Sequence, residues 1–256
     1  MATCNQQGNP SLYGLGMRIS FYSLWLGSLL VSYLTPSSVP NLRLLQTFFI
    51  LATFFALVLE SSWATISPVD AYITLLLTSA TFYIFIPVYI WKVLSMCNPF
   101  WDPTRWPRVP MTGFYKRWQL LTMIALAAYT IWFFGSGVGS LPSCKGPEGG
   151  QGKGYGFFFT QAPLDAGLFV AVNIVFAVEL LIGGLISLGV DLGLLRAISD
   201  TIVFTIVIIA IELTIQWNNL TPEVSDISTS AQLVPLFVVA GFLLHALYVW
   251  FNPDHD

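Results

Sequence analysis

The stretch TIVFTIVIIAIELTIQW (residues 201–217) is apolar along nearly its whole length and contains one carboxylate, Glu212. A helix that crosses the hydrocarbon core of a membrane needs about 20 mostly apolar residues, so this stretch predicts a membrane-spanning helix. A carboxylate at the centre of such a helix costs ~2.5–3.5 kcal/mol on insertion scales. Glu212 is therefore a candidate functional residue, with structural hydrogen bonding between helices as the alternative.

The rest of the chain has the same character. Of its 256 residues, 55% are hydrophobic and only 9% are charged, and the mean hydropathy is +0.73. Soluble domains carry about 25% charged residues, so this chain cannot cover a water-facing surface. The sequence has no basic patch of the kind that indicates nucleic-acid binding. The sequence predicts a polytopic membrane protein whose first partner is the lipid bilayer.

The apolar residues fall into seven stretches, which predict an all-α, seven-transmembrane helix bundle that forms a single integral membrane domain over residues 1–256. Each stretch is assigned as a helix because lipid requires backbone polar groups to be paired within the segment. The predicted spans are residues 17–35, 42–62, 70–94, 117–134, 165–190, 201–217 and 230–251. The glycine-rich segment 135–164 is expected to be a flexible loop.

The basic residues orient this bundle. Cytosolic loops of membrane proteins carry an excess of Lys and Arg. With the N-terminus outside or lumenal and the C-terminus cytosolic, the inner side collects Arg43, Lys92, Arg105, Arg108, Lys116, Arg117 and Arg196, whereas the outer side keeps Arg18, Lys145 and Lys153.

Two modification sites follow from this orientation. Cys4 and Cys144 lie on the same, oxidising side and can form a disulfide, with free thiols as the alternative. The sequence NLT at Asn219 is a glycosylation acceptor in the last outer loop. We expect an integral protein of the endoplasmic reticulum or another endomembrane.

Several polar residues within the spans recur at helical spacing, which places them on helix faces that turn towards the bundle interior. The topology puts Glu60, Asp70 and Glu212 in the outer half of three different spans, and Glu179 lies deeper. The predicted catalytic groups are Glu212 or Glu60 as general acid, with Asp70 and Glu179 tuning or relaying the proton. The predicted substrate-binding residues are Arg18, Trp63, Tyr72, Asn173, Gln216 and Trp217. For each of these residues the structural alternative is an interface anchor or a helix–helix hydrogen bond.

Carboxyl groups removed from water favour their protonated form and can act as general acids, and aromatic rings stabilise cations. Such a site suits protonation of an epoxide or alkene on a membrane-soluble isoprenoid, followed by carbocation cyclisation. The same carboxylates could instead conduct or relay protons or cations in a channel or transporter. No DDxxD, DxDD, HExxH, CxxC or GxSxG motif occurs, and the chain has only two histidines. The sequence predicts neither a metal site nor a cofactor.

The segment GNPSLYGLGMRISFY (residues 8–22) resembles the opening of a family of fungal polytopic membrane proteins with the pattern NPDxYGxGxR, with Ser11 where that pattern has Asp. Cys144 and GYGFFF (residues 154–159) resemble the outer loop of the same family. In size, span number and buried acids the chain also resembles the membrane-bound terpene cyclases of fungal meroterpenoid pathways. That resemblance implies a secondary-metabolite isomerase that protonates the epoxidised or plain prenyl chain of a lipophilic substrate. A channel, a transporter, a proton-linked protein and a structural membrane protein are the alternatives.

Overall fold

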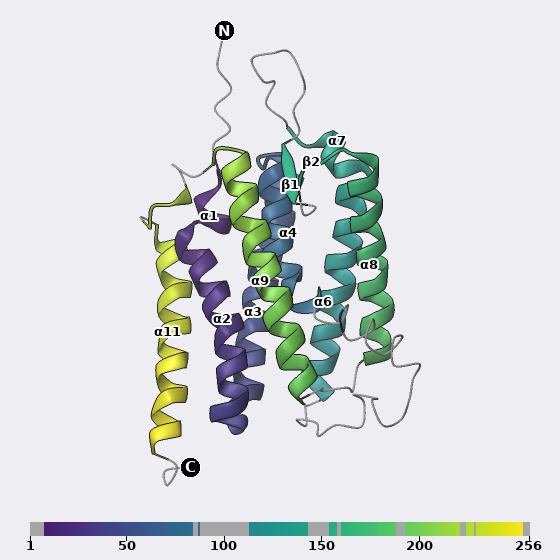
Figure 1. The fold of residues 1–256 in the computed structure, drawn as a ribbon. Coiled ribbons are helices and arrows are strands. Elements are labelled where there is room, and N and C mark those ends of the chain that lie inside the picture. Colours follow the sequence, from purple (N-terminus) through teal and green to yellow (C-terminus); the bar gives the residue numbers. More distant parts are fainter. Residues whose placement is uncertain are drawn as a thin grey trace.

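The computed structural model describes residues 8–83, 87, 113–142, 154–157, 160–187, 193–220, 224–227 and 229–252, and the side chains of Pro36 and residues 179–198 lie outside this description. The described chain is a bundle of long helices, so the all-α prediction is confirmed (Figure 1). We call the end of the bundle that carries α1 and the hairpin β1–β2 the upper end. The C-terminal end of α11 lies at the opposite, lower end (Figure 1).

Seven helices of the described chain are long: α2 (Leu15–Leu34), α3 (Val39–Ser62), α4 (Pro68–Tyr83), α6 (Gly113–Trp132), α8 (Gly167–Ser187), α9 (Gly193–Trp217) and α11 (Ser230–Phe251). The shorter elements are α1 (Pro10–Tyr13), a 3₁₀ turn (Pro36–Ser38), a π-helical turn (Phe133–Gly137), α7 (Val138–Ser140), β1 (Tyr155–Phe157) and β2 (Gln161–Pro163).

Five helical segments of the described chain are long and apolar enough to cross a membrane: Pro10–Leu34, Val39–Ser62, Gly113–Ser140, Ser199–Trp217 and Ser230–Phe251. The predicted span 70–94 is described only as α4 and residue 87, and its remainder lies outside the described residues. Helix α9 begins at Gly193, eight residues before the predicted start of its span. The integral membrane character predicted from composition is therefore supported by five candidate spans.

Helix α4 is the centre of the bundle and is buried along almost its whole length. Its hydroxyl groups are compatible with this burial because they bond back to the helix itself. Thr74 Oγ1 donates to the Asp70 carbonyl and Thr78 Oγ1 to the Thr74 carbonyl, each at 2.8 Å. Helix α11 is the opposite case: it packs mainly on α2, and most of its side chains are exposed. In a bilayer this exposed apolar face contacts lipid.

The segment predicted as a flexible loop contains an antiparallel hairpin, in which Tyr155 pairs with Pro163 and Phe157 with Gln161. Gly154 precedes it at φ +86, and a Cβ there would lie 2.0 Å from Cγ2 of Val69. The side chain of Asn218, at the end of α9, acts as a strand partner: its Oδ1 accepts from the Tyr155 N–H and its Nδ2 donates to the Tyr155 carbonyl, both at 2.9 Å. The loop prediction was wrong for Tyr155–Phe157 and Gln161–Pro163, because the order of these strands comes from contacts with α4 and α9.

Candidate functional site

Glu212 is the partner of a buried arginine. Arg18 Nη1 donates to both oxygens of the Glu212 carboxylate, with 2.5 Å to Oε2, and the side chains are 5% and 41% exposed respectively. The Tyr22 hydroxyl donates to Glu212 Oε1 at 2.9 Å. The remaining guanidinium donors reach the carbonyls of Tyr13 (3.1 Å) and Val224 (3.2 Å). The cost of placing Glu212 in an apolar helix is offset by this charged pair and its hydrogen bonds.

Asp70 is bound at the first turn of α4. Its Oδ2 accepts from the hydroxyl (2.8 Å) and the N–H (3.3 Å) of Ser67, and Ser67 Oγ in turn accepts from the Asp70 N–H at 3.2 Å. This reciprocal arrangement has the form of a capping box, which satisfies amide donors that the helix leaves unpaired. The other oxygen, Oδ1, accepts a short hydrogen bond from the Tyr13 hydroxyl. Asp70 is 3% exposed, and each of its two carboxylate oxygens accepts a hydrogen bond from a side chain of the protein.

Glu60 is held by Asn9. The amide nitrogen of Asn9 donates to Glu60 Oε2 at 2.5 Å, and the amide oxygen of Asn9 accepts from the Ser11 N–H at 3.1 Å, which caps α1. Asn9 therefore joins the start of the N-terminal helix to the end of α3. Pro10 follows at the first helical position, where its missing N–H costs nothing.

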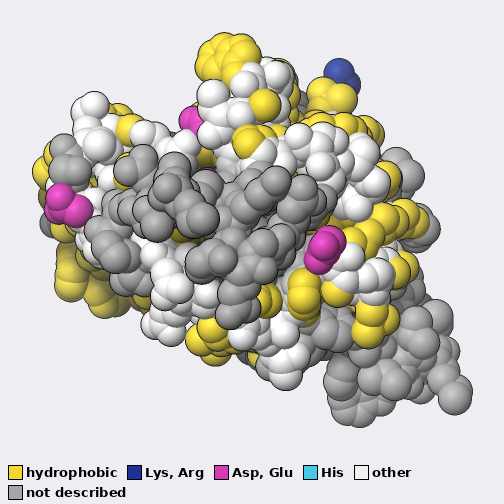
Figure 2. Space-filling model, turned by 90° about the horizontal axis from the view of Figure 1, so that it is seen from above, with side chains coloured by type: hydrophobic (Ala, Val, Ile, Leu, Met, Phe, Trp, Pro, Cys, Tyr) yellow, Lys and Arg dark blue, Asp and Glu magenta, His cyan; other side chains and the backbone are white. Residues whose placement is uncertain are grey.

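We call Glu60, Asp70 and Glu212 the upper carboxylates. Each of them binds a different residue of the segment 8–18. Asn9 binds Glu60, Tyr13 binds Asp70 and Arg18 binds Glu212. Seen from above, acidic side chains appear as separate spots among mostly hydrophobic and uncharged groups in the coloured part of the surface (Figure 2). Sequence reasoning found the three acids and Arg18 but missed Asn9, Tyr13 and Tyr22. The signal was present, because all three lie in the motif that carries the family resemblance.

The same segment also holds α11. The N–H of Gly16 donates to Oε1 of Gln232 at 3.1 Å, and a Cβ on Gly14 would lie 2.6 Å from the amide of Gln232. Gln232 is fully buried at the upper end of α11. The two glycines allow α11 to approach the chain near the start of α2 closely.

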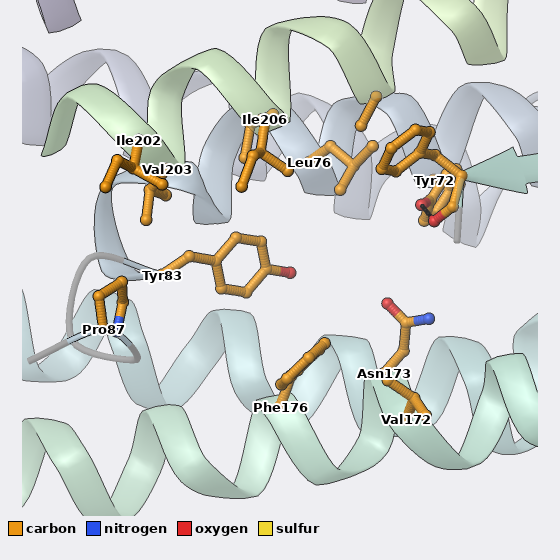
Figure 3. Close-up of a pocket in the computed structure, with 13 residues that line it drawn as sticks. Tyr72, Leu76, Tyr83, Pro87, Val172, Asn173, Phe176, Ile202, Val203 and Ile206 are labelled. Atoms are coloured by element: carbon orange, nitrogen blue, oxygen red, sulfur yellow. Dashed lines mark hydrogen bonds between the residues drawn. The ribbon is translucent and has the colours of Figure 1, made fainter. Parts of the chain in front are cut away.

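A cavity of about 380 Å³ lies between α4, α8 and α9, within the range of about 300–1,000 Å³ that is usual for small-molecule sites. The described residues that line it are uncharged: Tyr72, Leu76, Tyr83, Pro87, Phe157, Val172, Asn173, Phe176, Ile202, Val203, Ile206, Val207 and Ala210. Figure 3 shows the Tyr83 hydroxyl and the Asn173 amide pointing into the space between the helices. Phe157 belongs to the hairpin, which therefore covers the upper end of the cavity.

Of the predicted substrate-binding residues, Tyr72 and Asn173 line this cavity. Trp217 lies beside it, with its ring stacked on Phe157 at a centroid distance of 6.2 Å. Gln216 is exposed, and Trp63 is 68% exposed at the end of α3. None of the upper carboxylates is among the lining residues.

The remaining predicted positions divide into two groups. Cys4 and Cys144 lie outside the described residues, as does the side chain of Glu179, although its backbone belongs to α8. Asn219 is exposed just after α9, with φ +55. In the part of the chain that the structure describes, no group of three or more His, Cys, Asp or Glu residues could hold a metal ion.

Comparison with known proteins found no matching family profile, no similar curated protein and no similar solved structure. Function is therefore inferred from the geometry of the described residues.

Proposed function

We propose that this membrane protein binds a lipophilic small molecule in the cavity between α4, α8 and α9. The observation that carries the proposal is the lining: apolar side chains, the rings of Tyr72, Tyr83, Phe157 and Phe176, and very few polar groups. Small-molecule sites have this character, with a few placed polar atoms that fix orientation. The cavity lies among helices with lipid-facing sides, so a membrane-dissolved ligand is the class that fits it.

The finer proposal is cyclisation of an epoxidised or plain prenyl chain on a meroterpenoid-type substrate. The aromatic lining supports it, because rings stabilise carbocations. The initiating acid within this proposal is not Glu60, Asp70 or Glu212, since each has a structural partner away from the lining. Glu179 belongs to α8, which contributes to the cavity, and its side chain lies outside the described residues. The proposal keeps Glu179 as the candidate acid that the sequence offers and treats the other three carboxylates as structural groups.

The channel or transporter alternative has less support among the described residues. A cation path through a membrane is lined by carboxylates, carbonyls or water-filled polar surface. Here Glu60, Asp70 and Glu212 bind residues of the N-terminal segment, and the described lining of the cavity contains no carboxylate. This arrangement favours binding of an apolar molecule over passage of an ion.

A cavity-filling substitution tests the proposal. Ala210 lines the cavity and is 4% exposed, whereas Ile209, its neighbour in α9, is 45% exposed. We expect Ala210→Trp to reduce binding of a tritiated, photoreactive farnesyl diazirine at least tenfold, because the indole occupies the space of the ligand. Ile209→Trp is the matched control and should bind as the wild type does. Crosslinks recovered by mass spectrometry should map to α4, α8 and α9.

Equal labelling of the wild type and Ala210→Trp would contradict binding in this cavity. The same two variants test the finer proposal with a farnesylated phenolic epoxide as substrate. Turnover that is lost in Ala210→Trp and in Glu179→Gln, but retained in Ile209→Trp, supports a cyclase. If the wild type binds the farnesyl probe but does not turn over the epoxide, the cavity is a binding site and the epoxide is not a substrate.

The proposed topology adds α4 and α8 to the five candidate spans, with the upper end outside or lumenal. An odd number of crossings would put α1 and the end of α11 on opposite sides of the membrane, and the two lie at opposite ends of the bundle (Figure 1). We expect protein made in a eukaryotic host to carry an N-glycan on Asn219, seen as a gel shift on glycosidase treatment that Asn219→Gln abolishes. Labelling of an Asn219→Cys variant only by membrane-permeant maleimides would contradict this orientation.

A further inference from the structure

We infer that the ligand of this cavity is a lipophilic alcohol or phenol whose hydroxyl donates a hydrogen bond to the amide oxygen of Asn173. This inference rests on the proposed function, because it specifies the chemical class of the molecule that the cavity holds. It depends on the hydrogen bonds that Asn173 and Tyr72 already make within the protein.

Asn173 presents an acceptor to the cavity. Its Nδ2 donates to the Phe169 carbonyl, one turn earlier in α8, at 2.8 Å. A carbonyl can pair only with the amide nitrogen, so this bond fixes which way the amide is turned. The oxygen is therefore the atom left for a ligand, and Figure 3 shows it pointing into the cavity.

Tyr83 presents a second acceptor. Its hydroxyl points into the cavity (Figure 3). A phenolic oxygen has lone pairs that can accept a hydrogen bond from a donor in the cavity.

The third polar group, the Tyr72 hydroxyl, donates to the Phe157 carbonyl at 3.4 Å, so its proton is used within the protein. The Asn173 oxygen thus needs a donor from the ligand, and the Tyr83 oxygen can accept from the same hydroxyl. Towards Pro87, Ile202 and Val203 the lining is apolar, which suits a hydrocarbon body. A hydroxyl at one end of an apolar molecule meets both requirements, whereas an ether, an ester or a hydrocarbon leaves the Asn173 oxygen unpaired.

A matched pair of probes tests the donor. We would measure displacement of a fluorescent apolar probe from the purified full chain in nanodiscs by farnesol and by its methyl ether. We expect the wild type to prefer the alcohol about tenfold, which is the usual size of one hydrogen bond made to an otherwise unpaired acceptor. Asn173→Leu should remove this preference while it retains affinity for the ether, and Tyr83→Phe should reduce it.

The control is Thr205→Val in α9, an exposed threonine whose hydroxyl bonds to the Thr201 carbonyl and which is not among the lining residues. It should keep the preference for the alcohol. Equal affinities for alcohol and ether in the wild type would overturn the inference and leave cavity binding intact. The inference is also overturned if Asn173→Leu and Tyr83→Phe both keep the full preference. Should Asn173→Leu fail to fold, the wild-type comparison and Tyr83→Phe decide the question. Absence of any displacement would instead overturn the proposed function on which the inference rests.

Discussion

Replacement of Glu212 with leucine is expected to destabilise the protein by about 3 kcal/mol, because it leaves a buried arginine without its counter-ion. The side chain of Arg18 is 5% exposed and would keep only the carbonyls of Tyr13 and Val224. We place the effect at the low end of the range for broken buried pairs because the Glu212 side chain is 41% exposed. Unfolding in detergent, followed by tryptophan fluorescence, measures the loss.

A double-mutant cycle separates the pair from its surroundings. The combined Arg18→Met and Glu212→Leu variant should recover part of the stability lost by either single change, because no unpaired charge remains. Tyr22→Phe is a milder control that removes one hydrogen bond to Glu212, worth about 1 kcal/mol. A Glu212→Leu protein with wild-type stability and no activity would contradict the structural role and restore Glu212 as a catalytic group.

Replacement of Gly16 with leucine is expected to detach α11 from α2, with a loss of about 3 kcal/mol, the upper end for overpacking. A Cβ at Gly16 would lie 2.7 Å from Cβ of Gln232 and 2.8 Å from its carbonyl oxygen. Backbone atoms cannot rotate away, so the helix itself must move. Because α11 packs mainly on α2, little else in the described chain holds it. Faster proteolytic release of the C-terminal segment, together with a lower unfolding midpoint, would report the detachment.

Gly27→Ala is the matched control on the same helix pair. A Cβ there would lie 2.5 Å from Cδ2 of Leu243, the end of a side chain that can change rotamer. We expect a loss of less than about 1 kcal/mol, the cost of an off-rotamer side chain. Equal behaviour of Gly16→Leu and Gly27→Ala would contradict the view that the contact with the Gln232 backbone fixes α11.

The acids show how far sequence reasoning extends. Their spacing and the order of the spans predicted that Glu60, Asp70 and Glu212 lie at similar depth, and in the structure all three bind residues of the segment 8–18. The pairings could not be predicted, because they join residues up to 194 positions apart through side-chain directions that helical period alone does not give. In the described residues these three acids bind the N-terminal segment 8–18 to α3, α4 and α9, whereas the sequence alone had grouped them as a catalytic site.

The hairpin and the cavity are two further features that could not be predicted from the sequence. Strands β1 and β2 carry no strand signal strong enough to outweigh the glycines around them, and their order depends on Asn218, Val69 and Trp217. The apolar side chains that line the cavity, such as Ile202, Val203 and Ile206, have the same chemistry as those that face lipid or fill the core. No pattern of hydrophobicity distinguishes these three environments.

What the sequence alone determined is the medium and the helical conformation of the apolar stretches: stretches of this length dissolve in lipid, and lipid leaves the helix as the conformation that pairs their backbone groups. What only the tertiary structure decided is which polar side chains meet and where the helices fail to fill space. The physical reason is that solvent preference is a property of each segment, whereas pairing and packing depend on the relative rotation of several helices. Asn173 shows the difference, since it is one more polar residue in an apolar helix until α4 and α9 close around its amide oxygen.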